Sequence, residues 1–311
     1  MNTKRLTERD VGTAAQLVKD GALVAIPTET VYGLGTDGLN KEAVAAIFEA
    51  KGRPQDNPLI LHIPSDDWLE YYCTEIPPTA YILTKRFWPG PLTLILRRKP
   101  IVPDIVTGGL DTVGMRCPAH PLARAIIEQA GVPVAAPSAN TSGRPSCTTP
   151  ESVLEDMDGK IAAVVDGGAC TVGVESTIVD MTCTPPRLLR PGGVALESLR
   201  AVLGEVAVDE AVLRPMGDGE QPRAPGMKYR HYAPKAPVTV VKGAPEKTAR
   251  YILQNVRDKS GVLCFDEYAG LFAGHCVKAI GGAKDTAAQA RRVFDALRAF
   301  DHDDVTEIFA Q

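Results

Sequence analysis

Polar and cationic side chains cluster at the ends of several apolar runs, where an α/β protein binds its ligands. Lys51, Arg53 and Asn57 precede the apolar run 59–63, and His62 lies near its end. Other candidates of this kind are Thr30, Thr112, Arg116, Ser138, Ser146, Ser176 and Arg190. A single surface arginine or serine is usually solvated, but guanidinium groups and hydroxyls that converge bind phosphate or carboxylate well. The set therefore predicts a site for an anionic ligand.

The segment Gly33-Leu-Gly35-Thr-Asp-Gly38 matches the GxGxxG pattern of dinucleotide-binding folds. Such a fold needs the pattern directly after a strand, with an acidic residue about 20 residues later. Here residues 27–32 separate the pattern from the apolar run that ends at Ile26, and Pro58 occupies the later position. The pattern therefore favours a glycine-rich active-site loop whose backbone lies close to a ligand.

Other common catalytic patterns are absent from the sequence. It contains no Walker A segment and no GxSxG, since Ser138 lies in Ala-Pro-Ser-Ala-Asn. Cys117 and His120 suggest a thiol nucleophile, but without a supporting motif we predict a buried structural cysteine. Five histidines without HExxH argue against zinc. Seven cysteines without a CxxC pair indicate reduced thiols in a cytoplasmic protein.

Composition limits the partners of the chain. It has 311 residues, of which 44% are hydrophobic and 5% aromatic, and its formal net charge is −4. These values indicate a globular protein and argue against an extended basic surface for nucleic acid, although they allow a local basic pocket. No apolar run approaches the roughly 20 residues that cross a bilayer, so we expect no membrane partner.

Apolar periodicity predicts alternating helices and strands before residue 213. Expected helices cover 11–20, 41–51, 79–87 and 121–130, and expected strands cover 22–26, 59–63, 92–96, 112–116, 132–136, 161–165 and 177–181. Asn40 suits the N-cap of the second helix, and Gly21 and Gly131 suit helix C-termini. The alternation is typical of an α/β domain, and two closely spaced strands before Arg116 indicate a mixed sheet.

The character of the sequence changes after Leu213. The segment 214–237 is rich in proline and glycine and has no apolar period, which is typical of an interdomain linker. Expected strands at 238–241 and 261–265 and expected helices at 247–257 and 285–300 follow it. We therefore expect a catalytic domain over 1–213, a linker or lid over 214–237 and a small α/β domain over 238–311.

Four blocks of sequence, in order, resemble the signature blocks of the YrdC-type threonylcarbamoyl-AMP synthases. They are Pro27-Thr-Glu-Thr-Val-Tyr-Gly-Leu-Gly35, Lys51-Gly-Arg-Pro-Gln-Asp-Asn-Pro-Leu59, Ala136-Pro-Ser-Ala-Asn-Thr-Ser-Gly143 and Gly173-Val-Glu-Ser-Thr-Ile178. Arg190-Pro-Gly192 and Pro225-Gly-Met-Lys-Tyr-Arg-His-Tyr-Ala-Pro234 resemble the longer, two-domain form of that family. The resemblance covers residues 8–235 by motif and the remainder by layout.

The resemblance implies a YrdC fold, in which a twisted mixed α/β sheet surrounds a deep basic cavity, followed by a small Rossmann-like domain. It implies an L-threonylcarbamoyladenylate synthase, a nucleotidyltransferase that converts ATP, L-threonine and bicarbonate to threonylcarbamoyl-AMP and pyrophosphate. The product feeds the threonylcarbamoyl modification of the adenosine next to the anticodon in tRNA. The implied partners therefore include the tRNA-modifying machinery, and direct binding of tRNA is left open.

The resemblance also implies roles for individual residues, by their positions in the matching blocks. Implied threonine contacts are Thr30, His62, Arg116, Ala136 and Ser176. Implied ATP contacts are Arg53, Asn57, Thr112, Ser138, Ser146, Arg190 and Tyr232, with catalytic roles for Lys51 and Arg53. Arginine suits the carboxylate of an amino acid and the charge of a triphosphate. Mg²⁺ would accompany the nucleotide, held by phosphates and water, because no carboxylate cage is evident.

The string Lys228-Tyr-Arg-His-Tyr232 is richer in aromatic and cationic side chains than a spacer needs. We expect it to fold over the cavity mouth as a lid, with Tyr232, rather than Tyr229, on the nucleotide. Two alternatives use different chemistry: a non-catalytic module for double-stranded RNA or tRNA, and another carboxylate-activating or carbamoyl-transferring enzyme. The sequence assigns no chemical role to residues 238–311.

Overall fold

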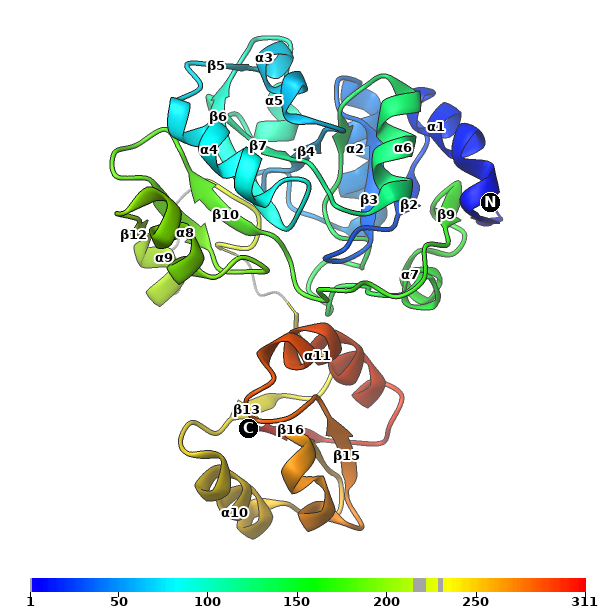
Figure 1. Ribbon diagram of the computed structural model, residues 1–311. Coiled ribbons are helices and arrows are strands. Elements are labelled where there is room, and N and C mark those ends of the chain that lie inside the picture. Colours follow the sequence, from blue (N-terminus) through cyan, green and yellow to red (C-terminus); the bar gives the residue numbers. More distant parts are fainter. Residues whose placement is uncertain (1, 215–221, 229–231) are drawn as a thin grey trace. The chain divides into compact units, whose positions relative to one another are not determined.

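The computed structural model describes residues 2–214, 222–228 and 232–311, and the chain divides into two compact units (Figure 1). The first unit comprises Met1–Ser142, Cys147–Cys170 and Glu175–Tyr229. The second comprises Gly143–Ser146, Thr171–Val174 and Arg230–Gln311. Each unit contains its own sheet.

A mixed sheet forms the centre of the first unit. Its strands follow the order β1-β9-β2-β3-β8-β4-β7-β6-β10-β11-β12, and β5 pairs with β6. The pair β4–β7 is parallel, whereas β2–β3 and β6–β7 are antiparallel, which confirms the predicted mixed sheet. The strands are β1 (Lys4–Leu6), β2 (Val24–Ile26), β3 (Gly33–Asp37), β4 (Ile60–His62), β5 (Cys73–Thr74), β6 (Leu92–Arg98), β7 (Thr112–Arg116), β8 (Val134–Ala135), β9 (Ala163–Val165), β10 (Thr177–Asp180), β11 (Arg187–Arg190) and β12 (Ala207–Val208).

The longer helices of the first unit have the predicted caps. The Asn40 side chain accepts a hydrogen bond from the Ala43 amide at the start of α2, and Gly131 ends α6 with a φ of 70°. The helices are α1 (Val11–Lys19), α2 (Lys41–Lys51), α3 (Leu69–Tyr72), α4 (Pro78–Phe87), α5 (Asp104–Thr107), α6 (Pro121–Ala130), α7 (Pro150–Met157), α8 (Leu196–Leu203) and α9 (Glu210–Leu213), with short 3₁₀ helices η1 (Glu8–Asp10) and η2 (Asp66–Trp68).

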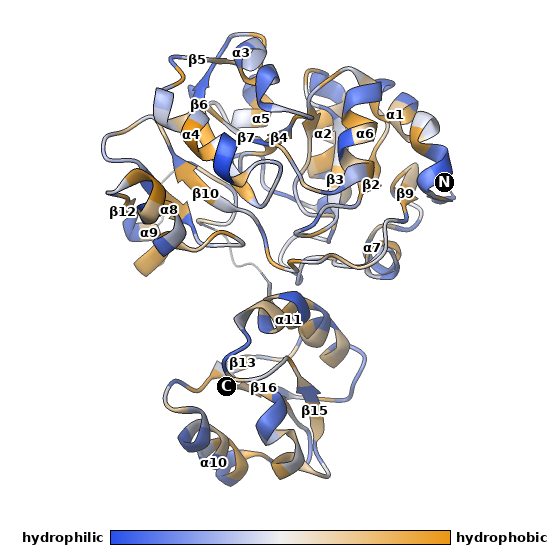
Figure 2. Ribbon diagram, in the orientation of Figure 1, coloured by the Kyte–Doolittle hydropathy of each residue, from blue (hydrophilic) through white to orange (hydrophobic). Residues whose placement is uncertain are grey.

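Alternation of side chains gives this sheet two different faces. Leu61 and Met115 point into the main apolar core, which also contains residues of α2 and α4. On the other face, Val134 packs with residues of α1 and α6, two helices that lie side by side (Figure 1). Both helices carry hydrophobic as well as hydrophilic residues, as expected for helices with one buried side (Figure 2). Each fully buried aliphatic side chain stabilises the fold by roughly 1.5–3 kcal/mol. A shift of one residue in the pairing of a strand would move these side chains to the opposite face, so their burial fixes the register of the strands.

The glycine-rich segment is a strand, and the predicted active-site loop is therefore wrong. Gly33–Asp37 forms β3, which pairs with β2 and β8. A Cβ atom at Gly35 would lie 2.8 Å from Val134 Cγ1, and one at Gly38 would lie 2.5 Å from Leu61 Cδ2. These glycines allow neighbouring side chains to pack closely against the strand, which explains the pattern without a ligand.

The second unit contains a parallel sheet of order β13-β16-β14-β15. Its elements are β13 (Val238–Val240), α10 (Pro245–Asn255), β14 (Ser260–Cys264), η3 (Asp266–Phe272), β15 (Cys276–Ala279), α11 (Thr286–Phe300) and β16 (Glu307–Ala310). Ile252, Val262 and Phe272 lie in its core. Across both units, none of the described helices is long and apolar enough to span a bilayer.

Candidate active site

Two adjacent strands, β4 and β7, bring three predicted site residues to one face of the first sheet. His62, at the end of β4, pairs with Arg116 of β7 on one side and with Val134 of β8 on the other. Because alternate residues share a face, Thr112 lies on the same side of β7 as Arg116. The pairing of Ile95 with Gly114 also places Thr93 of β6 on this side. We call this side, which carries His62, Thr93, Thr112 and Arg116, the site face.

Arg116 forms a buried ion pair that the sequence did not predict. Its Nη2 donates to Glu29 Oε1 at 2.7 Å, and its Nε donates to Gly90 O at 3.4 Å. The second oxygen of Glu29 accepts a hydrogen bond from the Ala119 amide at 2.9 Å. Both charged side chains are less than a tenth exposed. Glu29 therefore fixes the guanidinium plane of Arg116 in place.

His62 lies next to this ion pair and is neutral. Its ring is almost fully buried, and its Nδ1 has no hydrogen-bond partner within the described part of the chain. Burial, with the nearby charge of Arg116, lowers the pKa of His62 to about 3. A neutral imidazole with an unpaired nitrogen can donate to, or accept from, an uncharged polar group of a ligand.

Lys51 connects the end of α2 to the loop that follows β8. Its Nζ donates to Ser138 O at 2.5 Å and also to Asn140 O. Burial, together with the charge of Arg53, lowers the pKa of Lys51 to about 7. This pKa lies close to neutral pH, so the amine is partly protonated there, and the two carbonyl acceptors favour the protonated form. In the same loop, Ser138 Oγ donates to Asn140 Oδ1 at 2.5 Å.

Arg53 holds the loop that leads into β4. Its Nε donates to Asn57 O at 3.2 Å, and its Nη2 donates to Pro58 O at 2.9 Å. The Asn57 side chain is 2% exposed, and its Oδ1 has no partner among residues 2–214, 222–228 and 232–311. An unpaired buried polar atom costs about 1–3 kcal/mol, and a ligand that donates to Oδ1 would recover this energy.

Arg190 and Ser176 contact each other next to Thr93, on the β6 side of the site face. Arg190 Nη2 donates to Ser176 O at 2.9 Å and to Ser176 Oγ at 3.2 Å. The Ser176 hydroxyl also lies 2.7 Å from Thr93 Oγ1. The parallel pairing of β10 with β6 explains this contact, because it places Ser176 beside the start of β6.

A described part of the proline-rich segment, residues 222–228, packs on this face. Ala224 and Met227 contact an apolar cluster that contains Ile60, Ile95 and Ile178. Two polar contacts hold the same segment. Arg190 Nη1 donates to Pro225 O at 3.2 Å, and Lys228 Nζ lies 3.3 Å from Asp56 Oδ2. Residues 222–228 therefore contact Arg190 and Asp56, and Asp56 directly precedes Asn57 in the sequence.

The remaining predicted residues have varied surroundings. Thr30 is fully buried, with its hydroxyl 2.8 Å from Thr28 Oγ1, and the Ala136 amide donates to Ile60 O at 3.0 Å. Ser146 and Tyr232 group with the second unit, where the Tyr232 ring stacks on Phe294 at 4.9 Å. Tyr229, the other tyrosine considered for a lid, lies outside the described residues.

The structure offers no support for a thiol nucleophile at Cys117. Its thiol donates to Pro64 O at 3.2 Å, and burial raises the pKa of Cys117 to about 11. His120 instead caps α6, where its Nδ1 accepts a hydrogen bond from the Leu122 amide. In the described ranges, no group of three or more His, Cys, Asp or Glu side chains could hold a metal ion.

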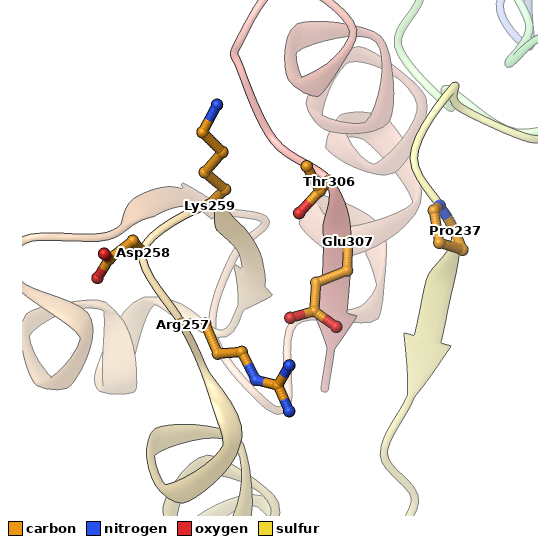
Figure 3. Close-up of a pocket in the computed structure, with 6 residues that line it drawn as sticks. All are labelled: Pro237, Arg257, Asp258, Lys259, Thr306 and Glu307. Carbon is orange, nitrogen blue, oxygen red and sulfur yellow. The ribbon is translucent and has the colours of Figure 1, made fainter.

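The second unit has a pocket of about 680 Å³ at the edge where its strands begin (Figure 3). Pro237, Lys259 and Thr306 directly precede β13, β14 and β16, and all three line it. Ligands of α/β sheets bind at the opposite edge, beyond the carboxyl ends of the strands. Two charged lining residues already have partners, since Glu307 accepts from Ser260 and Lys259 pairs with Asp304. We assign no chemistry to this pocket.

Comparison with known proteins finds relatives along the whole chain. Residues 16–192 match the family model described as "Telomere recombination", and residues 194–311 match "Threonylcarbamoyl-AMP synthase, C-terminal domain". The chain is 47% identical to the threonylcarbamoyl-AMP synthase of Pyrococcus abyssi over 99% of this chain and 90% of that protein. It is 46% identical to that of Bacillus subtilis with the same coverage.

Solved structures agree with this similarity. The structure of P. abyssi Sua5 complexed with L-threonine superposes with a TM-score of 0.92 and 46% identity, covering 100% of this chain and 92% of that chain. E. coli YciO has a TM-score of 0.57 and 24% identity, covering 64% of this chain and 100% of that chain, which shows a shared fold alone.

Proposed function

The chain belongs to the two-domain threonylcarbamoyl-AMP synthase family, and we propose that it makes threonylcarbamoyl-AMP from ATP, L-threonine and bicarbonate. It would act as a nucleotidyltransferase that releases pyrophosphate. The product is a reactive mixed anhydride, so an enzyme that transfers the threonylcarbamoyl group to tRNA must consume it. We place this activity in the cytoplasm, with the catalytic chemistry in residues 1–213, a linker over 214–237 and a separate domain over 238–311.

One observation carries the proposal: two buried polar atoms, Asn57 Oδ1 and His62 Nδ1, lack partners in the described part of the protein. Native proteins pair almost all such atoms, so each exception needs an explanation, and a ligand that completes the hydrogen bonds is one. Three basic residues come from neighbouring elements: Lys51 ends α2, Arg53 lies in the loop that enters β4, and Arg116 is on β7, which pairs with β4. Unpaired acceptors and donors beside cations suit a ligand with both neutral polar groups and negative charge.

The threonine subsite would use the site face. Arg116, fixed by Glu29, would bind the carboxylate of threonine through its remaining donors. His62 is neutral above a pKa of about 3, so its Nδ1 would pair with an uncharged group such as the threonine hydroxyl. Thr30, Ala136 and Ser176 would complete this subsite. A mostly buried pocket also disfavours the ammonium form of the substrate, which must lose a proton before it reacts.

The ATP subsite would lie in a basic cavity that Lys51, Arg53 and Arg190 line. Further contacts would come from Asn57, Thr112, Ser138, Ser146 and Tyr232. Residues 222–228 already contact Arg190 and Asp56, which supports a role for the linker as a cover over the nucleotide. Mg²⁺ would be bound through the phosphates, because the described side chains provide no carboxylate cluster for it.

The reaction would require positioning and charge stabilisation rather than a protein nucleophile. The unprotonated amine of threonine attacks the carbon of bicarbonate, and a carbamate forms as water leaves. A carbamate oxygen then bonds to the α-phosphorus of ATP while the bond to pyrophosphate breaks. Lys51, Arg53 and Arg190 would stabilise the negative charge that moves onto the leaving group.

The test is pyrophosphate release by the full-length protein with ATP and Mg²⁺, omitting threonine or bicarbonate in turn. Release that requires both substrates is expected. Release with other amino acids but not threonine would indicate another carboxylate-activating enzyme. Salt-dependent binding of RNA without any pyrophosphate release would overturn the proposal in favour of an RNA-binding module.

A further inference from the structure

The second unit includes two short segments from the part of the chain that carries the site blocks. Gly143–Ser146 follows the block that begins at Ala136, and it contains Ser146. Thr171–Val174 leads directly into Glu175 and Ser176. Both segments contact α11 or the residue that ends it.

Gly173 lies directly against the backbone of α11. A Cβ atom at this position would lie 2.4 Å from Arg291 Cα and 2.7 Å from Ala290 O, both on the helix. Gly173 also has a φ of 82°, which residues with side chains rarely adopt. Only glycine therefore permits the segment 171–174 to lie this close to the helix.

Charged side chains at the end of α11 hold the other segment. Arg298 is 4% exposed and its Nη1 donates to Pro145 O at 3.1 Å. The carboxylate of Asp301, whose side chain is 2% exposed, accepts from Arg144 Nη2 at 3.3 Å. The same carboxylate accepts from the Lys235 amide at 2.7 Å. Asp301 thus joins the segment 143–146 to the chain that follows the linker.

The aromatic residue predicted to contact ATP packs on the same helix. The Tyr232 ring stacks on Phe294 with a centroid distance of 4.9 Å and an interplanar angle of 27°. The next residue, Ala233, donates its amide to Gly143 O at 2.9 Å. The segment 143–146, Tyr232 and α11 therefore form one contact network within the second unit.

We propose that α11 is a platform that fixes the conformation of the segments 143–146 and 171–174 and of Tyr232, with Gly173 and Asp301 as positioning residues for substrate binding. The second unit then acts on the reaction without supplying a reacting group. Ordering a backbone residue costs roughly 1–2 kcal/mol, so segments held in advance by a helix bind a ligand at a lower entropic cost. The expected effect on substrate binding rests on the proposed function. The conformational order of the two segments does not depend on it.

The first test compares Gly173→Ala with Gly168→Ala in the full-length protein. Gly168 has a similar φ of 74°, but a Cβ atom there would meet nothing within 4 Å. The two variants thus share the backbone strain and differ in the clash with α11. We expect Gly173→Ala to raise the KM for ATP about tenfold and to speed amide hydrogen exchange in 143–146 and 171–174. Gly168→Ala should change neither by more than twofold.

The second test removes the charge at the end of α11. Asp301→Ala should raise the KM for ATP about tenfold, and adding Arg144→Ala to it should have little further effect because the two residues act together. Asp304→Ala is the control, since its ion pair with Lys259 is exposed. A purely structural role would lower the active fraction and therefore kcat, but it would leave the KM unchanged.

The outcomes separate this inference from the proposed function. Hydrogen exchange reports the order of the two segments whether or not the wild-type protein releases pyrophosphate. Equal exchange in Gly173→Ala and Gly168→Ala would overturn the platform. Equal KM values for ATP in Asp301→Ala and Asp304→Ala, with an active wild type, would overturn it as well. An inactive wild type with faster exchange only in Gly173→Ala would overturn the proposed function and leave the platform standing.

Discussion

The two sheets of this protein differ in how the polar groups at their strand ends are satisfied. In the first unit, Asn57 Oδ1 and His62 Nδ1 have no hydrogen-bond partner among the described residues, and Arg53 and Arg116 lie next to them. In the second, the chain itself pairs the groups at the carboxyl ends of the strands. Gly281 donates to Asp266 at 3.0 Å, and Ala283 donates to Glu267 at 3.0 Å. Gln311 donates to Pro245 O and Thr248 Oγ1, both at 2.9 Å.

This difference shows that a fold alone does not create a site. The crevice at the carboxyl ends of parallel strands is where α/β domains bind ligands, and the second unit has such an edge. Its own carboxylates and the Gln311 amide already bind the backbone groups there. At the site of the first unit, two buried polar atoms, Asn57 Oδ1 and His62 Nδ1, lack partners among the described residues, at an energetic cost that a bound substrate would offset.

The strongest test of this contrast compares one arginine from each unit. Arg190→Ala removes a guanidinium that contacts Ser176 and the linker, and we expect kcat/KM for pyrophosphate release to fall about 100-fold, as for loss of a charged hydrogen bond in a transition state. Arg292→Ala removes a half-exposed partner of Asp266 and should change kcat/KM less than twofold. Similar losses in the two variants would contradict the contrast.

The unpaired His62 should also affect stability in acid. Its pKa of about 3 in the folded protein lies below the ordinary 6.5, so between these values the unfolded chain binds more protons. Stability therefore falls as the pH is lowered through this range, by about 2 kcal/mol from pH 7 to pH 5. His62→Gln should lose about 2 kcal/mol less than wild type over that interval, measured by denaturant unfolding. His120 is present in both proteins, so its contribution cancels. An equal loss in both would show that His62 is not buried as a neutral ring.

A substitution of Glu29 tests whether its ion pair with Arg116 serves the binding of threonine or only the folding of the first unit. Glu29→Gln keeps the shape of the side chain but removes the charge that fixes Arg116. We expect the KM for threonine to rise about tenfold, a loss of about 1.4 kcal/mol, with a change of less than twofold in the KM for ATP. Steady-state kinetics with each substrate varied in turn measures both. Equal increases for the two substrates would show that Glu29 has a general structural role.

The sequence predicted those helices and strands that are long enough for the spacing of their apolar residues to be recognised. The helices expected at 41–51 and 121–130 match α2 and α6, and the strand expected at 112–116 matches β7. Strands β5, β8 and β12 have two residues each, which is too short for alternation to show in the sequence, and only β8 was predicted, as part of a longer apolar run. Gly33–Asp37 was misread because the glycines match a ligand-binding pattern, while their cause is close packing against Val134 and Leu61.

The candidate residues were found by type and by resemblance, and their roles remain predictions. The structure adds what spacing cannot give. Glu29 and Arg116 are 87 positions apart, so no local pattern shows that they form an ion pair. The charge of Glu29 inside the run Pro27–Gly35 was the only available signal. The contacts of Gly173 with α11 were equally hidden, because they depend on tertiary packing between distant segments.

The smallest effect concerns the carboxyl ends of the strands in the second unit, where pairing should serve stability alone. Gln311→Ala removes hydrogen bonds to Pro245 O, Thr248 Oγ1 and the Phe265 amide. We expect the local free energy of unfolding to fall by about 1 kcal/mol, measured by hydrogen exchange of amides in β14 and β16. The KM for ATP should change less than twofold, because the unit stays folded and α11 keeps its contacts. Asn255→Ala is the control, since its side chain makes an exposed hydrogen bond to Tyr251 O. A large change in the KM for either substrate would mean that this edge takes part in binding, and the contrast between the two sheets would fail.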